Sequence, residues 1–108
     1  CQEAMRRYRY SEQDILDGLE DLLEGQYDRL LRNVKFHRRG LDGEQDLQAW
    51  QRTVFDYYEV KASLHPRAEA RAYRQFERSR RAWGKMLRYC YLVVPAKHGL
   101  EIYGPIQF

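Results

Sequence analysis

Seven cations in the second half of the sequence are spaced so that they could bind phosphate groups together. They recur alternately every four and every three residues between positions 67 and 88, and side chains at this spacing gather on one side of an α-helix. The members of this basic stripe are Arg67, Arg71, Arg74, Arg78, Arg81, Lys85 and Arg88. Because like charges at such spacing repel one another, we expect the stripe to face phosphates or an acidic partner.

The first ten residues offer a second group of cations. Arg6, Arg7 and Arg9 alternate with Tyr8 and Tyr10. Guanidinium groups bind phosphates, and tyrosine rings stack on unpaired bases. We therefore expect residues 1–10 to form a basic and aromatic arm that extends the footprint of the stripe on a nucleic acid.

No sequence motif indicates catalysis. The chain has no glycine-rich phosphate loop, no HExxH and no nucleophile elbow. His37, His65 and His98 lie in different segments, and Cys1 and Cys90 form no CxxC pair. The sequence thus predicts a non-enzymatic protein with no cofactor and no metal site.

Three helices are expected to position these residues. Ser11 can cap a first helix, whose apolar residues recur every three or four positions from Ile15 to Val34; the alternative is a break in this helix near Gly25. A turn near Gly40 separates this helix from a second one that ends before Pro66. The residues expected on the apolar face of the second helix are Leu47, Trp50, Val54, Tyr57, Tyr58 and Leu64.

The third predicted helix carries the basic stripe. Pro66 suits its first turn, and the periodic pattern continues to Val94. Phe76, Trp83 and Leu87 fall on the side opposite the cations and are expected to face the core. The segment that follows, residues 95–108, contains Pro95, Gly99, Gly104 and Pro105 and is expected to be an extended or hairpin tail.

The predicted fold is therefore mainly α, a three-helix bundle with a short extended or hairpin C-terminal tail, and residues 1–108 form one domain. A chain of 108 residues with 44% hydrophobic and 14% aromatic residues can build one core. The longest apolar run is far shorter than the roughly 20 residues that span a bilayer, so no membrane span is expected. Two cysteines without a disulfide framework favour a reducing cytoplasm.

Two functions are compatible with this pattern. The first is a nucleic-acid-binding module for DNA or RNA that contacts phosphates through the stripe; the net charge of +3 is modest, but acidic residues concentrate before position 29. The alternative is an interaction or assembly domain, either a homo-oligomer or a subunit of a larger complex. In that case the stripe would contact an acidic helix of a partner, or the acidic face of the first helix of a second copy.

Overall fold

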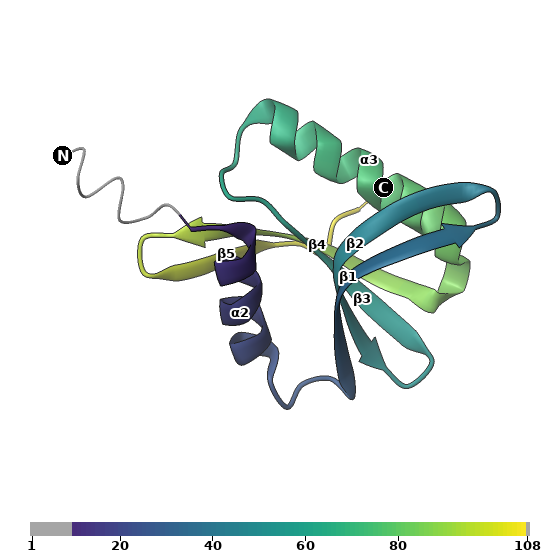
Figure 1. The fold of residues 1–108 in the computed structure, drawn as a ribbon, viewed down its shortest axis with the longest axis horizontal. Helices are drawn as coiled ribbons and strands as arrows, with labels where there is room; N and C mark the ends of the chain where they lie inside the picture. Colours follow the sequence, from purple (N-terminus) through teal and green to yellow (C-terminus); the bar gives the residue numbers. More distant parts are fainter. Residues whose placement is uncertain (1–9, 108) are drawn as a thin grey trace.

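The structure is a computed structural model, and it describes residues 10–107. Two helices accompany a mixed sheet of five strands (Figure 1). The elements in chain order are α2 (Glu12–Leu23), β1 (Arg29–Arg38), β2 (Leu41–Gln51), β3 (Val54–Val60), α3 (Pro66–Trp83), the short 3₁₀ helix η1 (Gly84–Met86), β4 (Leu87–Ala96) and β5 (Gly99–Tyr103). This is an α/β fold, so the prediction of a mainly α three-helix bundle is wrong.

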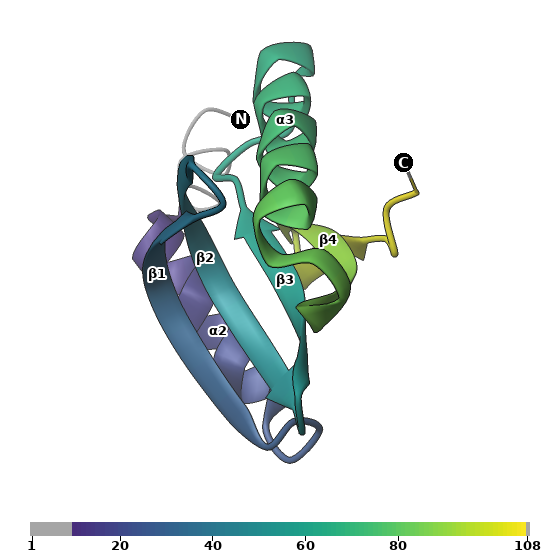
Figure 2. The same cartoon turned by 90° about the vertical axis from the view of Figure 1, so that its right-hand side faces the viewer.

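The strands lie in the sheet in the same order as in the chain, from β1 to β5. Neighbouring strands are antiparallel except β3 and β4, which are parallel and connected by α3. The two helices lie on opposite faces of the sheet (Figure 2). Each face therefore has its own hydrophobic cluster beneath its own helix.

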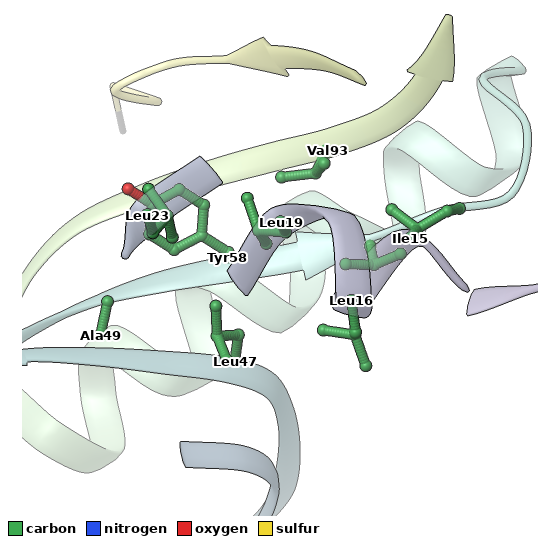
Figure 3. Close-up of a cluster of buried hydrophobic side chains, with 9 residues drawn as sticks. Ile15, Leu16, Leu19, Leu23, Leu47, Ala49, Tyr58 and Val93 are labelled. Carbon is green, nitrogen blue, oxygen red and sulfur yellow. The ribbon is translucent and has the colours of Figure 1, made fainter. Parts of the chain in front are cut away.

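Helix α2 begins where the sequence predicts it. Ser11 Oγ accepts a hydrogen bond from Asp14 N (3.1 Å), and the Asp14 carboxylate accepts one from Ser11 N (3.2 Å). The buried side of the helix packs on the sheet in the cluster drawn in Figure 3, which contains Ile15, Leu16, Leu19, Leu23, Leu47, Ala49, Tyr58 and Val93. The helix ends at Leu23, because Gly25 adopts a φ of 81° that cannot continue it. The predicted continuation to Val34 is wrong.

The second predicted helix is also wrong, because residues 41–60 form the hairpin of β2 and β3. The turn near Gly40 is present, but it links two strands: Arg39 and Gly40 both have positive φ, as a tight two-residue hairpin turn requires. In β3 the aromatic residues at 55, 57 and 58 alternate between the two faces of the sheet, so that Phe55 and Tyr57 pack on the α3 side and Tyr58 on the α2 side.

Helix α3 starts at Pro66 as predicted, but it ends at Trp83 rather than near Val94. Gly84, at a φ of 60°, interrupts it, and the chain returns to the sheet as β4. Residues in the run Leu87–Val94 are mostly aromatic or branched, which suits a buried strand better than a helix end. Helix α3 packs through Ala72 and Phe76 on the second hydrophobic cluster of the sheet.

The C-terminal part of the chain contains a hairpin, but one that is built into the sheet. β4 begins at Leu87, well before the predicted tail, and β5 pairs with it antiparallel. The predicted N-terminal arm lies outside the described residues except for Tyr10, so Arg6, Arg7 and Arg9 have no structural account. Between residues 10 and 107, no helix has both the length and the apolar character that a bilayer span requires.

Candidate functional site

Two carboxyl side chains meet across the β2–β3 hairpin. Leu47 pairs with Tyr58, and the next position along this antiparallel register places Asp46 opposite Glu59. Asp46 Oδ2 accepts a hydrogen bond from the backbone N of Val60 (2.8 Å). Asp46 and Glu59 each act on the pKa of the other, which indicates that the two carboxyls lie close together. The hairpin thus holds two neighbouring acids beside the carboxyl end of β3.

Three further side chains surround this carboxyl pair. Lys61 Nζ lies 3.3 Å from Glu59 Oε2, and its backbone N donates to Val93 O on β4 (2.9 Å). The Tyr57 hydroxyl donates a hydrogen bond to Glu59 Oε1 and lies 3.3 Å from Gln75 Oε1 of α3. In the sequence Glu59-Val60-Lys61, residues 59 and 61 point to the same side of the strand. We call Asp46, Glu59 and Lys61 the carboxylate–lysine cluster.

Burial dominates the electrostatics of this cluster. The Glu59 side chain is only 4% exposed, and desolvation, followed by the charge of Asp46, raises the pKa of Glu59 to about 8. The hydrogen bond from Tyr57 and the charge of Lys61 act in the opposite direction but do not compensate. Desolvation likewise raises the pKa of the Asp46 carboxyl. Lys61 therefore compensates the charge of this pair only in part.

A cavity of about 320 Å³ lies beside the cluster, between α3 and the β1–β2 hairpin. Its lining residues are Asp42, Gly43, Glu44, Lys61, Arg71, Arg74, Gln75 and Arg78. Four of them are cations and two are acids, so the cavity attracts anions. Arg71 and Arg74 are exposed and form no ion pair with any residue between positions 10 and 107, which leaves their guanidinium groups available to a ligand.

The structure divides the seven predicted phosphate-binding residues. Arg71, Arg74 and Arg78 line the cavity, and Arg81 lines a neighbouring depression. Arg67 is exposed near the start of α3 but borders neither hollow, and Lys85 belongs to η1. Thus five of the seven cations share α3, while the stripe as one continuous helix face does not exist.

Arg88 is the clearest departure from the predicted stripe. It lies on β4, and its Nε and Nη2 atoms each donate to Asp56, at 2.9 Å. Tyr27 and the backbone N of Tyr89 donate to the same carboxylate, at 2.6 and 3.1 Å. Arg88 is therefore engaged in an internal ion pair.

The other titratable groups offer no larger metal-binding cluster. Within the part of the chain that the structure describes, no three His, Cys, Asp or Glu side chains come together as metal ligands. His65 accepts a hydrogen bond from Ala68 N (3.3 Å) and caps α3, while His37 pairs with Asp42 at the β1–β2 hairpin (2.5 Å). The pair formed by Asp46 and Glu59 lies beside the cavity that Lys61 lines.

The acidic face of α2 is partly neutralised within the chain. Arg32 on β1 forms ion pairs with Asp17 (2.6 Å) and with Glu20. This internal pairing reduces the charge that α2 could offer to the basic residues of a second copy.

No family model, curated protein or solved structure matches this chain. The site is therefore defined by its own geometry. Asp46, Glu59 and Lys61 were not predicted as site residues, because they fall within the segment predicted to be the second helix. The available signal was the run from Val54 to Lys61, in which strand-forming residues alternate and an acid and a lysine stand two positions apart.

Proposed function

We propose that this chain hydrolyses phosphodiester bonds in nucleic acid, with a divalent cation such as Mg²⁺ bound by Asp46 and Glu59. The observation that carries the proposal is the carboxylate–lysine cluster beside a cavity lined by arginines. Glu59 and Lys61 stand at the carboxyl end of β3, the strand that runs parallel to β4. A carboxylate pair and phosphate-binding cations at one place supply what metal-assisted phosphoryl transfer needs.

Asp46 and Glu59 would supply two carboxylates to a magnesium ion, which would share the Glu59 oxygens with the Tyr57 hydroxyl and with Lys61. Mg²⁺ keeps several of its waters and is commonly held by one or two carboxylates together with substrate phosphates, so two protein ligands suffice. Its charge would also favour the ionised form of buried Glu59 and half-buried Asp46, whose pKa values are raised without it. When bound, the ion supplies Lewis-acid polarisation of a phosphate oxygen and an acidified water.

The chain's own residues have distinct tasks in this reaction. Asp46 and Glu59 hold the cation, and the Tyr57 hydroxyl orients Glu59. Lys61 stabilises negative charge that develops on the phosphoryl oxygens, while Arg71, Arg74 and Arg78 hold the phosphodiester in the cavity. Water supplies the oxygen that joins phosphorus and releases a proton; the bond to the leaving sugar oxygen breaks, and that oxygen takes up a proton.

Nucleic acid is the proposed substrate because it is a polyanion that can contact several arginines along α3 at once. This proposal keeps the predicted phosphate contacts of Arg71, Arg74, Arg78 and Arg81 but replaces the non-enzymatic module expected from sequence with a catalytic one. The unpaired, buried thiol of Cys90 is compatible with a reducing compartment, so the cytoplasm remains the proposed location.

The decisive experiment measures cleavage of end-labelled DNA and RNA, single-stranded and duplex, with Mg²⁺ or Mn²⁺ and with EDTA. We expect metal-dependent cleavage that falls by at least about 100-fold in Glu59→Gln and Lys61→Met, because each removes charge at the reacting phosphate. Circular dichroism should show that both variants are folded.

Matched control variants carry the same substitutions at exposed positions of the sheet and its turns. Glu101→Gln and Lys97→Met should cleave as the parent does. If the folded parent binds nucleic acid but cleaves none of the four substrates, the catalytic proposal is wrong and the binding module is correct. Cleavage that survives in Glu59→Gln and Lys61→Met would equally exclude this site.

A further inference from the structure

The cavity beside the carboxylate–lysine cluster continues along α3. A second depression of about 190 Å³ is lined by Leu41, Arg74, Glu77, Arg78 and Arg81. Because Arg74 and Arg78 line both hollows, the two form one groove between α3 and the β1–β2 hairpin. We call this the α3 groove. From Arg71 to Arg81 the helix rises about 15 Å, which sets the length of the groove.

The far end of the groove is closed by the hairpin tip. Arg38 Nε donates to Ala82 O (3.2 Å), and Arg39 Nη1 donates to Arg81 O (3.3 Å). These contacts place two cations at the carboxyl end of α3, where the helix dipole favours them. The tip is thereby fixed against the last turn of α3, as the proximity of the two elements in Figure 1 shows.

Aromatic packing fixes the tip further. The ring of Phe36 meets that of Trp83 edge to face, with centroids 5.8 Å apart, and the Arg38 guanidinium lies 4.4 Å from the centre of the Trp83 ring. Gly43 leaves room for Phe36, because a Cβ atom at position 43 would overlap that ring. The wall opposite α3 is therefore a pair of strands whose tip packs on the end of that helix.

Positive charge continues along the floor of the groove. In its distal part Arg74, Arg78 and Arg81 face a single acid, Glu77, and Arg78 also donates to the backbone O of Asp42 (3.3 Å). A groove lined by cations along one edge tracks a sugar–phosphate backbone without reading its bases. Because α3 bounds the groove on one side and the β1–β2 hairpin on the other, a backbone that lies in the groove has protein on both sides.

We propose that the α3 groove holds a single strand of nucleic acid next to the phosphodiester that is cleaved, so that the enzyme acts on single strands or frayed ends. This inference rests on the proposed function. Arg81 is then a substrate-binding residue about 15 Å along the helix from Arg71, and it contacts only substrates long enough to reach it.

The test compares charge reversal inside and outside the groove. Arg81→Glu lies in the groove, and Arg67→Glu is the matched control, since Arg67 is exposed on the same helix but lines neither hollow. With a single-stranded oligonucleotide of about 12 nucleotides, we expect Arg81→Glu to raise KM at least about fivefold and Arg67→Glu less than about twofold. With one of about 3 nucleotides, the two variants should behave alike.

The outcomes separate this inference from the proposed function. Equal effects of Arg81→Glu and Arg67→Glu on the long substrate, or equally fast cleavage of a blunt duplex and a single strand, would overturn the groove while leaving the catalytic site intact. If the parent cleaves nothing, the proposed function fails, and binding of the labelled long single strand in EDTA still decides the groove. In that binding measurement, a loss of affinity in Arg81→Glu but not in Arg67→Glu supports the groove as a binding site for a single strand. Equal affinities of the two variants reject it.

Discussion

Strand β3 carries two buried carboxylates three residues apart, and they have opposite surroundings. Asp56 is 1% exposed and receives four hydrogen bonds, two of them from the Arg88 guanidinium. Glu59 is similarly buried but stands beside another carboxyl, Asp46, with one lysine at 3.3 Å. Because residues 56 and 59 point to opposite faces of the strand, one sheet separates the two environments.

The difference indicates what each carboxylate is for. The hydrogen bonds to Asp56 join the α2–β1 connection, through Tyr27, to β3 and β4. The hydrogen bond to Asp56 also raises the pKa of Arg88, which stabilises the charged form of the guanidinium. The Asp56 carboxylate is buried and fully hydrogen-bonded, while the Arg88 side chain is 39% exposed, and we interpret this ion pair as structural. At Glu59 the compensation is incomplete, and incomplete compensation beside a cavity is typical of binding and catalytic sites.

Isosteric amide substitutions should separate the two carboxylates most strongly. Asp56→Asn removes the charge that Arg88 requires and turns an acceptor into a donor, so we expect a loss of about 3 kcal/mol in the free energy of unfolding. For a domain of this size that loss lowers Tm by about 15 °C. Glu59→Gln should leave stability unchanged or raise it in EDTA at pH 8, because it removes a poorly compensated charge. Urea denaturation of both variants beside the parent measures the contrast, and equal losses would remove the distinction.

The sequence alone predicted local features better than the sheet. The cap at Ser11, the helix start at Pro66 and the turn at Gly40 depend on neighbouring residues, and each was placed correctly. The strands were missed because the apolar residues of β2 and β3, counted along the chain, also recur every three or four positions, as they do on one face of a helix. The turn between β2 and β3 was not recognisable from the sequence, because Arg52 takes a φ of 57° at a position where glycine or asparagine is usual.

The candidate site was predictable only in part, for the same reason. Arg71, Arg74 and Arg78 were selected from their helical spacing, which α3 preserves. The proximity of Asp46 and Glu59 depends on the register of a hairpin, and residues thirteen positions apart are not neighbours on a helix. Helical spacing also assigned Arg88 to the stripe, although the helix ends five residues before it.

The pH dependence of stability should come from the Glu59 side of the comparison. In the metal-free protein the pKa of Glu59 is about 8, against an ordinary value of 4.5, so the folded chain binds more protons than the unfolded chain between these values. The free energy of unfolding should therefore fall as pH rises from about 5 to about 8, by on the order of 2 kcal/mol relative to Glu59→Gln. Parallel curves for the parent and Glu59→Gln in EDTA would show that Glu59 is not the cause.

Removing one hydroxyl from each environment should give the smallest but most specific contrast. Tyr27→Phe deletes the 2.6 Å hydrogen bond to Asp56 and should cost about 1.5 kcal/mol of stability, without changing the Mg²⁺ requirement for cleavage. Tyr57→Phe deletes the hydrogen bond that orients Glu59. Its main effect should be a several-fold rise in the Mg²⁺ concentration needed for half-maximal cleavage, because the carboxylate that holds the ion is less well placed.

Magnesium titrations of cleavage, together with urea denaturation, measure both effects in the same pair of variants. Tyr73→Phe provides a control, since that tyrosine is exposed on α3 and lines neither hollow of the α3 groove. If Tyr57→Phe were to lose as much stability as Tyr27→Phe while its Mg²⁺ requirement matched that of the parent, Tyr57 would be a structural residue like Tyr27. Asp56 and Glu59 would then differ only in the side chains around them. The proposal that Glu59 holds a metal ion would no longer be supported by the effect of its hydrogen bond from Tyr57.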